Sequence, residues 1–120
     1  MSHSTAHHGA AIDLPDLMDK IGDDSDLLQE LLTAFVEDHQ NDGRRLRAAI
    51  EQRNQSSGHM LAHSLKGLAG NLSAMRLFEV TREVDDLIQA GRWEVITPAL
   101  DRFDAELARV LQFIEKQRGF

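Results

Sequence analysis

Apolar residues recur at spacings of three and four along four long segments of the chain, which is the period of an amphipathic α-helix. The last segment is the clearest, because its apolar stripe runs without a gap from Leu100 to Ile114. Strand signals are absent, since there is no Tyr and no alternating run of polar and apolar residues. The sequence therefore predicts an all-α fold, an antiparallel up-down four-helix bundle with a short extra N-terminal helix.

Capping residues, prolines and glycines predict where the helices end. Asp13 caps a short first helix that has Pro15 in its first turn and ends at Gly22. A second helix is predicted to begin at a cap formed by Asp24 or Ser25 and to kink or break near Gly43. A third helix should begin within 54–57 and run to about Leu72, with a tight turn at Ser73, and a fourth should end at Gly91. A helical turn over 93–96 should then precede a last helix, capped by Thr97 with Pro98 in its first turn.

The length of 120 residues suits a single domain, and we find no internal repeat. Residues 1–11 are small, polar and rich in histidine, so we expect a flexible N-terminal tail followed by a bundle domain over 12–118. The histidines of this segment are His3, His7 and His8. Imidazoles can bind metals opportunistically, but we interpret these three as part of a disordered tail and not as a metal site.

Composition excludes several classes of partner. The formal net charge is −7, from 20 acidic and 13 basic residues, whereas nucleic acids and anionic membranes select Lys and Arg. We therefore expect neither as a partner. The chain has no cysteine, no signal-peptide pattern and no apolar run near the ~20 residues that cross a bilayer. These features favour a cytoplasmic location.

The stretch LAHSLKGLAGN, residues 61–71, has two different faces on a helical wheel of about 100° per residue. Its leucines, together with the one at position 72, share a side that we expect to be buried. The polar side lies nearly half a turn away and contains His59, His63, Lys66, Gly67 and Gly70.

The two glycines need an explanation, because each costs roughly 0.5–1 kcal/mol relative to alanine inside a helix. One explanation is close packing of a neighbouring helix against Gly67 and Gly70. The other is a surface kept bare so that a partner can approach His63. We favour the bare surface, because the glycines lie opposite the leucines and the chain is too short to supply a second covering layer.

Other chemistries fit the residues less well. His59 and His63 have the i, i+4 spacing of a helical metal pair, but their helix offers no carboxylate or cysteine to complete a site. Ser64 lies about 100° round the helix from His63 and cannot meet its ring, and no nucleotide-binding motif is present. We expect His39 to be a surface residue and Trp93 to cover one end of the bundle.

Residues 62–77, AHSLKGLAGNLSAMRL, resemble the signature of histidine phosphotransfer (Hpt) domains of multistep two-component phosphorelays. The resemblance extends over roughly 13–116, through LLQELLTAFVEDH and LRAAIE upstream and LIQAGRWEVITPALDRF downstream. One departure is Ser73, where glycine is frequent in the family, and it concerns the geometry of the turn.

The resemblance implies that His63 accepts a phosphoryl group from the aspartyl phosphate of a receiver domain. An exposed neutral imidazole is a nucleophile, which agrees with this role. Lys66 would then neutralise the phosphoryl oxygens, while Gly67 and Gly70 would admit the receiver's loops and His59 would shape the rim. A hydrogen-bond partner for the second ring nitrogen of His63 is expected from another helix.

The implied partners are the receiver domains of a hybrid histidine kinase and of response regulators. The receiver is expected to bring Mg²⁺, so this chain would bind no cofactor and would act as a monomeric phosphoryl carrier rather than an enzyme. Two alternatives remain open. One is a P1-type phospho-accepting domain of a chemotaxis-like histidine kinase, and the other is a non-phosphorylated helical adaptor bundle.

Overall fold

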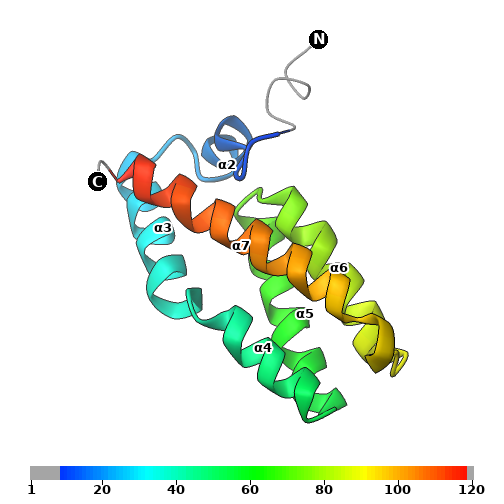
Figure 1. Cartoon of the computed structure of the whole chain (residues 1–120). Helices are drawn as coiled ribbons and strands as arrows, with labels where there is room; N and C mark the ends of the chain where they lie inside the picture. Colours follow the sequence, from blue (N-terminus) through cyan, green and yellow to red (C-terminus); the bar gives the residue numbers. More distant parts are fainter. Residues whose placement is uncertain (1–8, 119–120) are drawn as a thin grey trace.

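The computed structural model describes residues 9–118, and within them the backbone forms helices and no strand (Figure 1). The all-α class predicted from the sequence is confirmed. The elements in chain order are α2 (Leu14–Lys20), α3 (Ser25–His39), α4 (Asp42–Glu51), α5 (Gln55–Asn71), α6 (Met75–Gln89), the short 3₁₀ helix η1 (Trp93–Val95) and α7 (Thr97–Gln117).

Three helices begin at the side-chain caps predicted from the sequence. Asp13 accepts a hydrogen bond of 3.2 Å from the first turn of α2, and Asp24 accepts one of 3.0 Å from that of α3. Asn54 does the same for α5, also at 3.0 Å. Such caps contribute about 1 kcal/mol each. The prediction for α7 was wrong by one position, because the N-cap is Ile96, which has no capping side chain, and Thr97 is already helical.

The second predicted helix is interrupted at residues 40–41, which separates α3 from α4 just before Gly43. At this junction Nδ1 of His39 forms a hydrogen bond of 2.8 Å with Oδ2 of Asp42. Nη1 of Arg45 lies 3.4 Å from the other carboxylate oxygen, and Asp42 is only 5% exposed. His39 is therefore part of a half-buried junction. The expectation of a simple surface residue was wrong, because the ring is bonded to the buried carboxylate of Asp42 and contacts the ring of Phe35.

The apolar stripe of α7 forms the centre of the core. This helix packs against α3, α4 and α6, and Figure 1 shows it running between them. Phe103 and Ile114 of α7 are completely buried, and they meet Leu32 of α3 and Val84 of α6 in the same core cluster. Each such side chain contributes about 1.5–3 kcal/mol to stability through burial. An apolar residue at every turn therefore favours a helix that packs on the core, which is why the periodic segments predicted the helices well.

The buried face of α5 is centred on Ala62, Leu65 and Ala69, which are at most 2% exposed. Leu61 and Leu68, which we had expected to be buried, are only partly buried at the edges of the core. The difference has a simple cause. A helical wheel interpreted from leucines alone overlooks the alanines. Their small side chains let α5 approach α4 and α6, the two helices that pack most extensively on it.

The turn at residues 72–74 joins α5 to α6 and contains Ser73 with a φ of +58°. Non-glycine residues rarely adopt this left-handed conformation. The hydroxyl of Ser73 donates to Asp16 at 2.6 Å and accepts from Nζ of Lys20 at 2.9 Å. The serine thus forms the turn despite its strain, and its hydroxyl ties the turn to α2.

The packed part of the chain includes residue 11, because Ala11 and Ile12 are both buried in the core. No helix in the described part of the chain is long and apolar enough to span a membrane. Most of the predicted N-terminal tail, residues 1–8, lies outside the described residues, and so do the tail histidines His3, His7 and His8.

Candidate functional site

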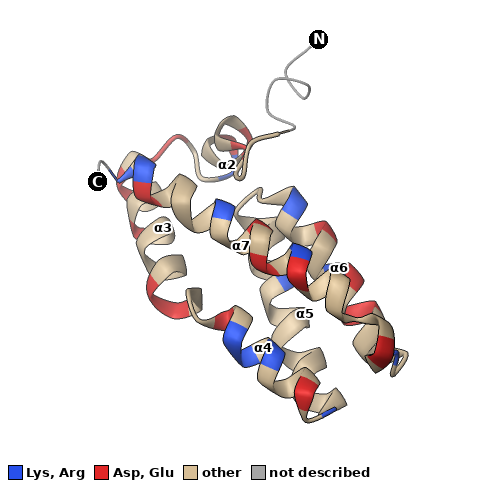
Figure 2. Ribbon diagram, viewed as in Figure 1, with Lys and Arg blue, Asp and Glu red and all other residues tan. Residues whose placement is uncertain are grey.

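The charge pattern of α5 differs from that of its neighbours. Acidic and basic side chains are interspersed along α6 and α7, whereas α5 carries one charged residue, Lys66 (Figure 2). His63 lies on the same helix, three positions before Lys66. The surface around His63 therefore has a single ammonium group one turn away, and it also carries the exposed side chain of Met60 three positions earlier.

The side chain of His63 is exposed on α5. Within residues 9–118 no hydrogen bond is formed by its ring, and the partner that we expected from another helix is not found. The ring of His59, one turn earlier, lies 5.6 Å away between centroids, with 40° between the two ring planes. A neutral imidazole in this position has an accessible lone pair and can act as a nucleophile.

Gly67 and Gly70 have different surroundings. A Cβ atom added to Gly67 would meet nothing within 4 Å, so the surface beside His63 is open there. A Cβ atom at Gly70 would lie 3.5 Å from Cδ1 of Phe78 on α6, and the carbonyl of Gly70 accepts a hydrogen bond of 3.0 Å from Lys20. The expected bare surface is present at Gly67 and absent at Gly70, because α6 and α2 cover that end of α5.

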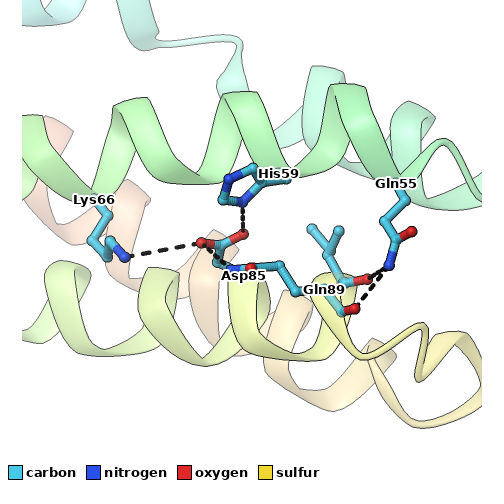
Figure 3. Close-up of polar contacts among 6 residues, drawn as sticks. Gln55, His59, Lys66, Asp85 and Gln89 are labelled. Atoms are coloured by element: carbon cyan, nitrogen blue, oxygen red, sulfur yellow. Dashed lines mark hydrogen bonds and ion pairs between the residues drawn. The ribbon is translucent and has the colours of Figure 1, made fainter.

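Asp85 of α6 is a buried carboxylate that reaches the polar side of α5, with a side chain only 1% exposed. Its Oδ1 lies 2.8 Å from Nδ1 of His59, and its Oδ2 accepts a hydrogen bond of 3.1 Å from Gln89. Nζ of Lys66 lies 3.9 Å from Oδ2. Figure 3 shows His59 and Lys66 approaching the carboxylate from α5. These partners explain the burial, since an unpaired buried carboxylate costs several kcal/mol.

The contact between Lys66 and Asp85 is loose. Its length of 3.9 Å exceeds that of a hydrogen bond, and the lysine side chain is 26% exposed. Partly exposed ion pairs of this kind contribute about 0–1 kcal/mol. An anion placed on the ring of His63 can therefore compete with Asp85 for the ammonium group of Lys66.

Asp85 was not predicted as a site residue, although the sequence contains a signal for it. On α6 the positions just before and three after it, Val84 and Ile88, are buried and apolar, so a carboxylate falls on the core-facing stripe. An acid in such a position needs a partner. The sequence could not identify His59 as that partner, because the pairing depends on the axial position at which α6 packs on α5.

A metal site at His59 and His63 receives no support. The described residues contain no group of three or more His, Cys, Asp or Glu side chains that could hold a metal ion. Ser64 is exposed and makes no hydrogen bond with His63 in the described part of the chain. The arrangement is suited to nucleophilic attack by an imidazole, with positive charge nearby.

The site is a surface rather than a pocket. A groove of about 1140 Å³ exists elsewhere, over α6, α7 and the segment before α2. Its lining includes none of the residues of the polar side of α5, and its arginines are already paired, as Arg76 is with Glu106 at 3.2 Å and Arg102 with Glu83 at 2.6 Å. Any partner of His63 must therefore dock onto α5 from outside.

Comparison with known proteins agrees with this description. A family model described as "Hpt domain" matches residues 30–113. Among solved structures, histidine-containing phosphotransfer protein B (HptB) from Pseudomonas aeruginosa PAO1 superimposes with a TM-score of 0.82 at 24% sequence identity, covering 92% of this chain and 96% of that chain. At this level of identity the superposition shows a shared fold. No curated protein matches the chain.

Proposed function

Because this chain belongs to the Hpt domain family, we propose that it is a histidine phosphotransfer carrier. It accepts a phosphoryl group on His63 from the aspartyl phosphate of one receiver domain and passes the group to the receiver domain of a response regulator. The observation that carries the proposal is the exposed ring of His63, which stands beside the open surface at Gly67 and within one turn of Lys66.

The proposed step needs little chemistry from this chain. A ring nitrogen of His63 uses its lone pair to attack phosphorus, and the P–O bond to the receiver's aspartate breaks. The aspartate leaves as a carboxylate, while the second ring nitrogen of His63 keeps its hydrogen. Lys66 turns from Asp85 toward the phosphoryl oxygens and balances part of their charge. Positioning and charge stabilisation dominate phosphoryl transfer, so a carrier without turnover of its own can support it.

The partners are part of the proposal. The donor is the receiver domain of a hybrid histidine kinase, the acceptor is the receiver domain of a response regulator, and the receivers bring the Mg²⁺. The open surface at Gly67 supports docking there, and the half-buried Gly70 and His59 border that surface. We further propose that the chain acts as a monomer in the cytoplasm and that its helices follow the up-down four-helix arrangement.

The proposal is tested by incubating the purified chain with receiver domains that carry radiolabelled aspartyl phosphate. We expect transfer of label to the chain, stable in base and labile in acid, and its loss in His63→Gln. The matched control is His39→Gln, because it removes another partly exposed imidazole, which lies at the α3–α4 junction and is bonded to Asp42. The control should accept label as the wild type does.

Other results would contradict the proposal in distinguishable ways. Labelling by an ATP-bound kinase domain but by no receiver would indicate the P1-type domain of a chemotaxis-like kinase. Absence of labelling, with partner binding unchanged in His63→Gln, would indicate an adaptor bundle.

A further inference from the structure

Asp85 fixes the orientation of the His59 ring. The hydrogen bond between Nδ1 and Oδ1 measures 2.8 Å, and the acceptor is buried on α6 and cannot follow a moving imidazole. With Nδ1 engaged, the second ring nitrogen, Nε2, lies on the side of the ring nearer to Lys66 (Figure 3). His59 remains 41% exposed in its side chain, so Nε2 can contact a group added to the surface.

His59 and Lys66 lie on either side of His63 along α5. His59 precedes it by four positions and Lys66 follows it by three, and both spacings bring side chains together on a helix. The centroids of the two imidazoles are 5.6 Å apart. A phosphoryl group on His63 would therefore stand between an imidazole and an ammonium group that share one carboxylate, Asp85.

The protonation state of His59 decides what it offers to such a group. A neutral imidazole that donates from Nδ1 to Asp85 presents a lone pair at Nε2, whereas a protonated one presents an N–H at both nitrogens. A phosphoryl group brings a charge of about −1.5 to −2. The ring of His63, which keeps the hydrogen of its second nitrogen and so becomes cationic, balances part of this charge together with Lys66, but Asp85 already attracts that ammonium. One proton taken up by His59 supplies further positive charge.

The charged or titratable groups that contact His59 are few. In the described part of the chain they are Asp85 from α6 and His63 from α5, with Lys66 on the same carboxylate. Helix α4, which also packs on α5, contributes no hydrogen bond or ion pair to His59. The electrostatic change at His59 during phosphorylation therefore comes mainly from the phosphoryl group.

From this geometry, and resting on the proposed function of His63, we propose that His59 is a second phosphoryl-binding group. In its protonated form it donates Nε2–H to a phosphoryl oxygen on His63, while Asp85 accepts Nδ1–H. Asp85 is the positioning residue, since it orients the ring and stabilises its cationic form. Phosphorylation of this chain is thereby coupled to the uptake of one proton from solvent.

The test loads the chain with phosphoramidate, a small donor that needs no docking surface. A ring nitrogen of His63 attacks phosphorus, the P–N bond of phosphoramidate breaks, ammonia leaves, and the second ring nitrogen of His63 keeps its hydrogen. The ¹⁵N chemical shifts of His59 are then recorded before and after loading, at a pH where the unloaded ring is neutral. We expect His59 to become doubly protonated when His63 is phosphorylated.

Two variants separate binding of the phosphoryl group from a role in docking. Hydrogen bonds between charged groups are stronger than those between neutral groups, so His59→Gln should lower the equilibrium constant for loading by about tenfold. Asp85→Asn keeps an acceptor for Nδ1–H but removes the charge, and His59 should then stay neutral on loading. His39→Gln is the matched control, because it alters a His–Asp pair remote from His63 and should load as the wild type does.

The outcomes are separable. Unchanged ¹⁵N shifts at His59, or a loading constant in His59→Gln equal to that of the wild type, would overturn the inference even if receivers phosphorylate His63. A defect of His59→Gln seen with receivers but not with phosphoramidate would assign His59 to docking and would also overturn it. Loading by phosphoramidate with the expected shifts, but by no receiver, would support the inference and refute the proposed partners. Absence of loading at His63 would refute both.

Discussion

The hydroxyl of Ser73 donates a hydrogen bond of 2.6 Å to Oδ2 of Asp16, which lies 57 positions earlier in the chain. Lys20 completes the link, because its ammonium group donates to the same hydroxyl at 2.9 Å and to the carbonyl of Gly70 at 3.0 Å. The short helix α2 thus stabilises the turn at which α5 ends, on the helix that carries His63.

We predict that Ser73→Ala destabilises the protein more than Ser73→Gly. Alanine loses both hydrogen bonds of the buried hydroxyl and keeps the strained φ of +58°, so we expect a loss of about 1–3 kcal/mol in the free energy of unfolding. Glycine also loses the bonds but removes strain of about 1–2 kcal/mol. Urea denaturation measures both variants, and an alanine variant as stable as the glycine variant would show that the strain is not present.

The stability of the wild type should fall at low pH partly through Asp16. The hydrogen bond from Ser73, followed by that from Lys20, lowers the pKa of Asp16 below its ordinary value of 3.8. A lowered pKa in the folded state means that the stabilisation is fully present above pH 3.8 and is lost as pH falls through the folded pKa. Asp16→Asn should flatten this part of the stability curve, measured by denaturation between pH 2 and 5, roughly the range over which carboxylates titrate. An unchanged curve would refute it.

We predict that the same substitution acts differently at two glycines of α5. Gly67→Gln should raise the free energy of unfolding by up to about 1 kcal/mol, since it removes a helical glycine and a Cβ there meets no atom within 4 Å, but should slow transfer from a receiver by obstructing docking. Gly58→Gln should lower the free energy of unfolding, because Gly58 is buried and a Cβ there would lie 3.2 Å from Cδ1 of the fully buried Ile88, which the longer side chain must displace. Normal transfer by Gly67→Gln would show that the receiver docks elsewhere.

Lys66→Gln should slow acceptance of phosphate on His63 by roughly tenfold, the effect of losing about 1.4 kcal/mol of charge stabilisation in the transition state. Its thermal stability should change little, because the ion pair with Asp85 is long and partly exposed. Lys66→Arg keeps the charge and should recover part of the rate. Rapid-quench measurement of phosphorylated chain checks this, and equal rates in all three proteins would exclude a role for the ammonium group.

The features that could be predicted from sequence are those set by local chemistry. Asp13 and Asn54 cap helices through bonds within a single turn, and the stripe of α7 is buried because its period matches the helix. The position of His63 on the exposed side of α5 follows from the same wheel. Each of these needs only residues close together in the chain.

The features that could not be predicted depend on contacts between helices. Asp85 lies 26 positions from His59, and the two meet only when α6 packs on α5 in this register. The sequence predicts a bare surface at Gly70, because no residue near it in the chain indicates that Phe78 and Lys20 cover it. His39 is a different case, because its partner Asp42 lies only three positions away, and the feature that the sequence did not predict is the burial of that carboxylate.

The location of His59, His63 and Lys66 on α5 and of Asp85 on α6 has a consequence for folding. The two helices are consecutive and joined only by residues 72–74, so Asp85 and His59 are 26 positions apart, against 57 for Ser73 and Asp16. Closing so short a loop costs little entropy, and contacts of low sequence separation form quickly. We therefore expect this hairpin to bring the carboxylate and its imidazole together early in folding. During synthesis both are present before the ribosome has made α7, the helix that later completes the core.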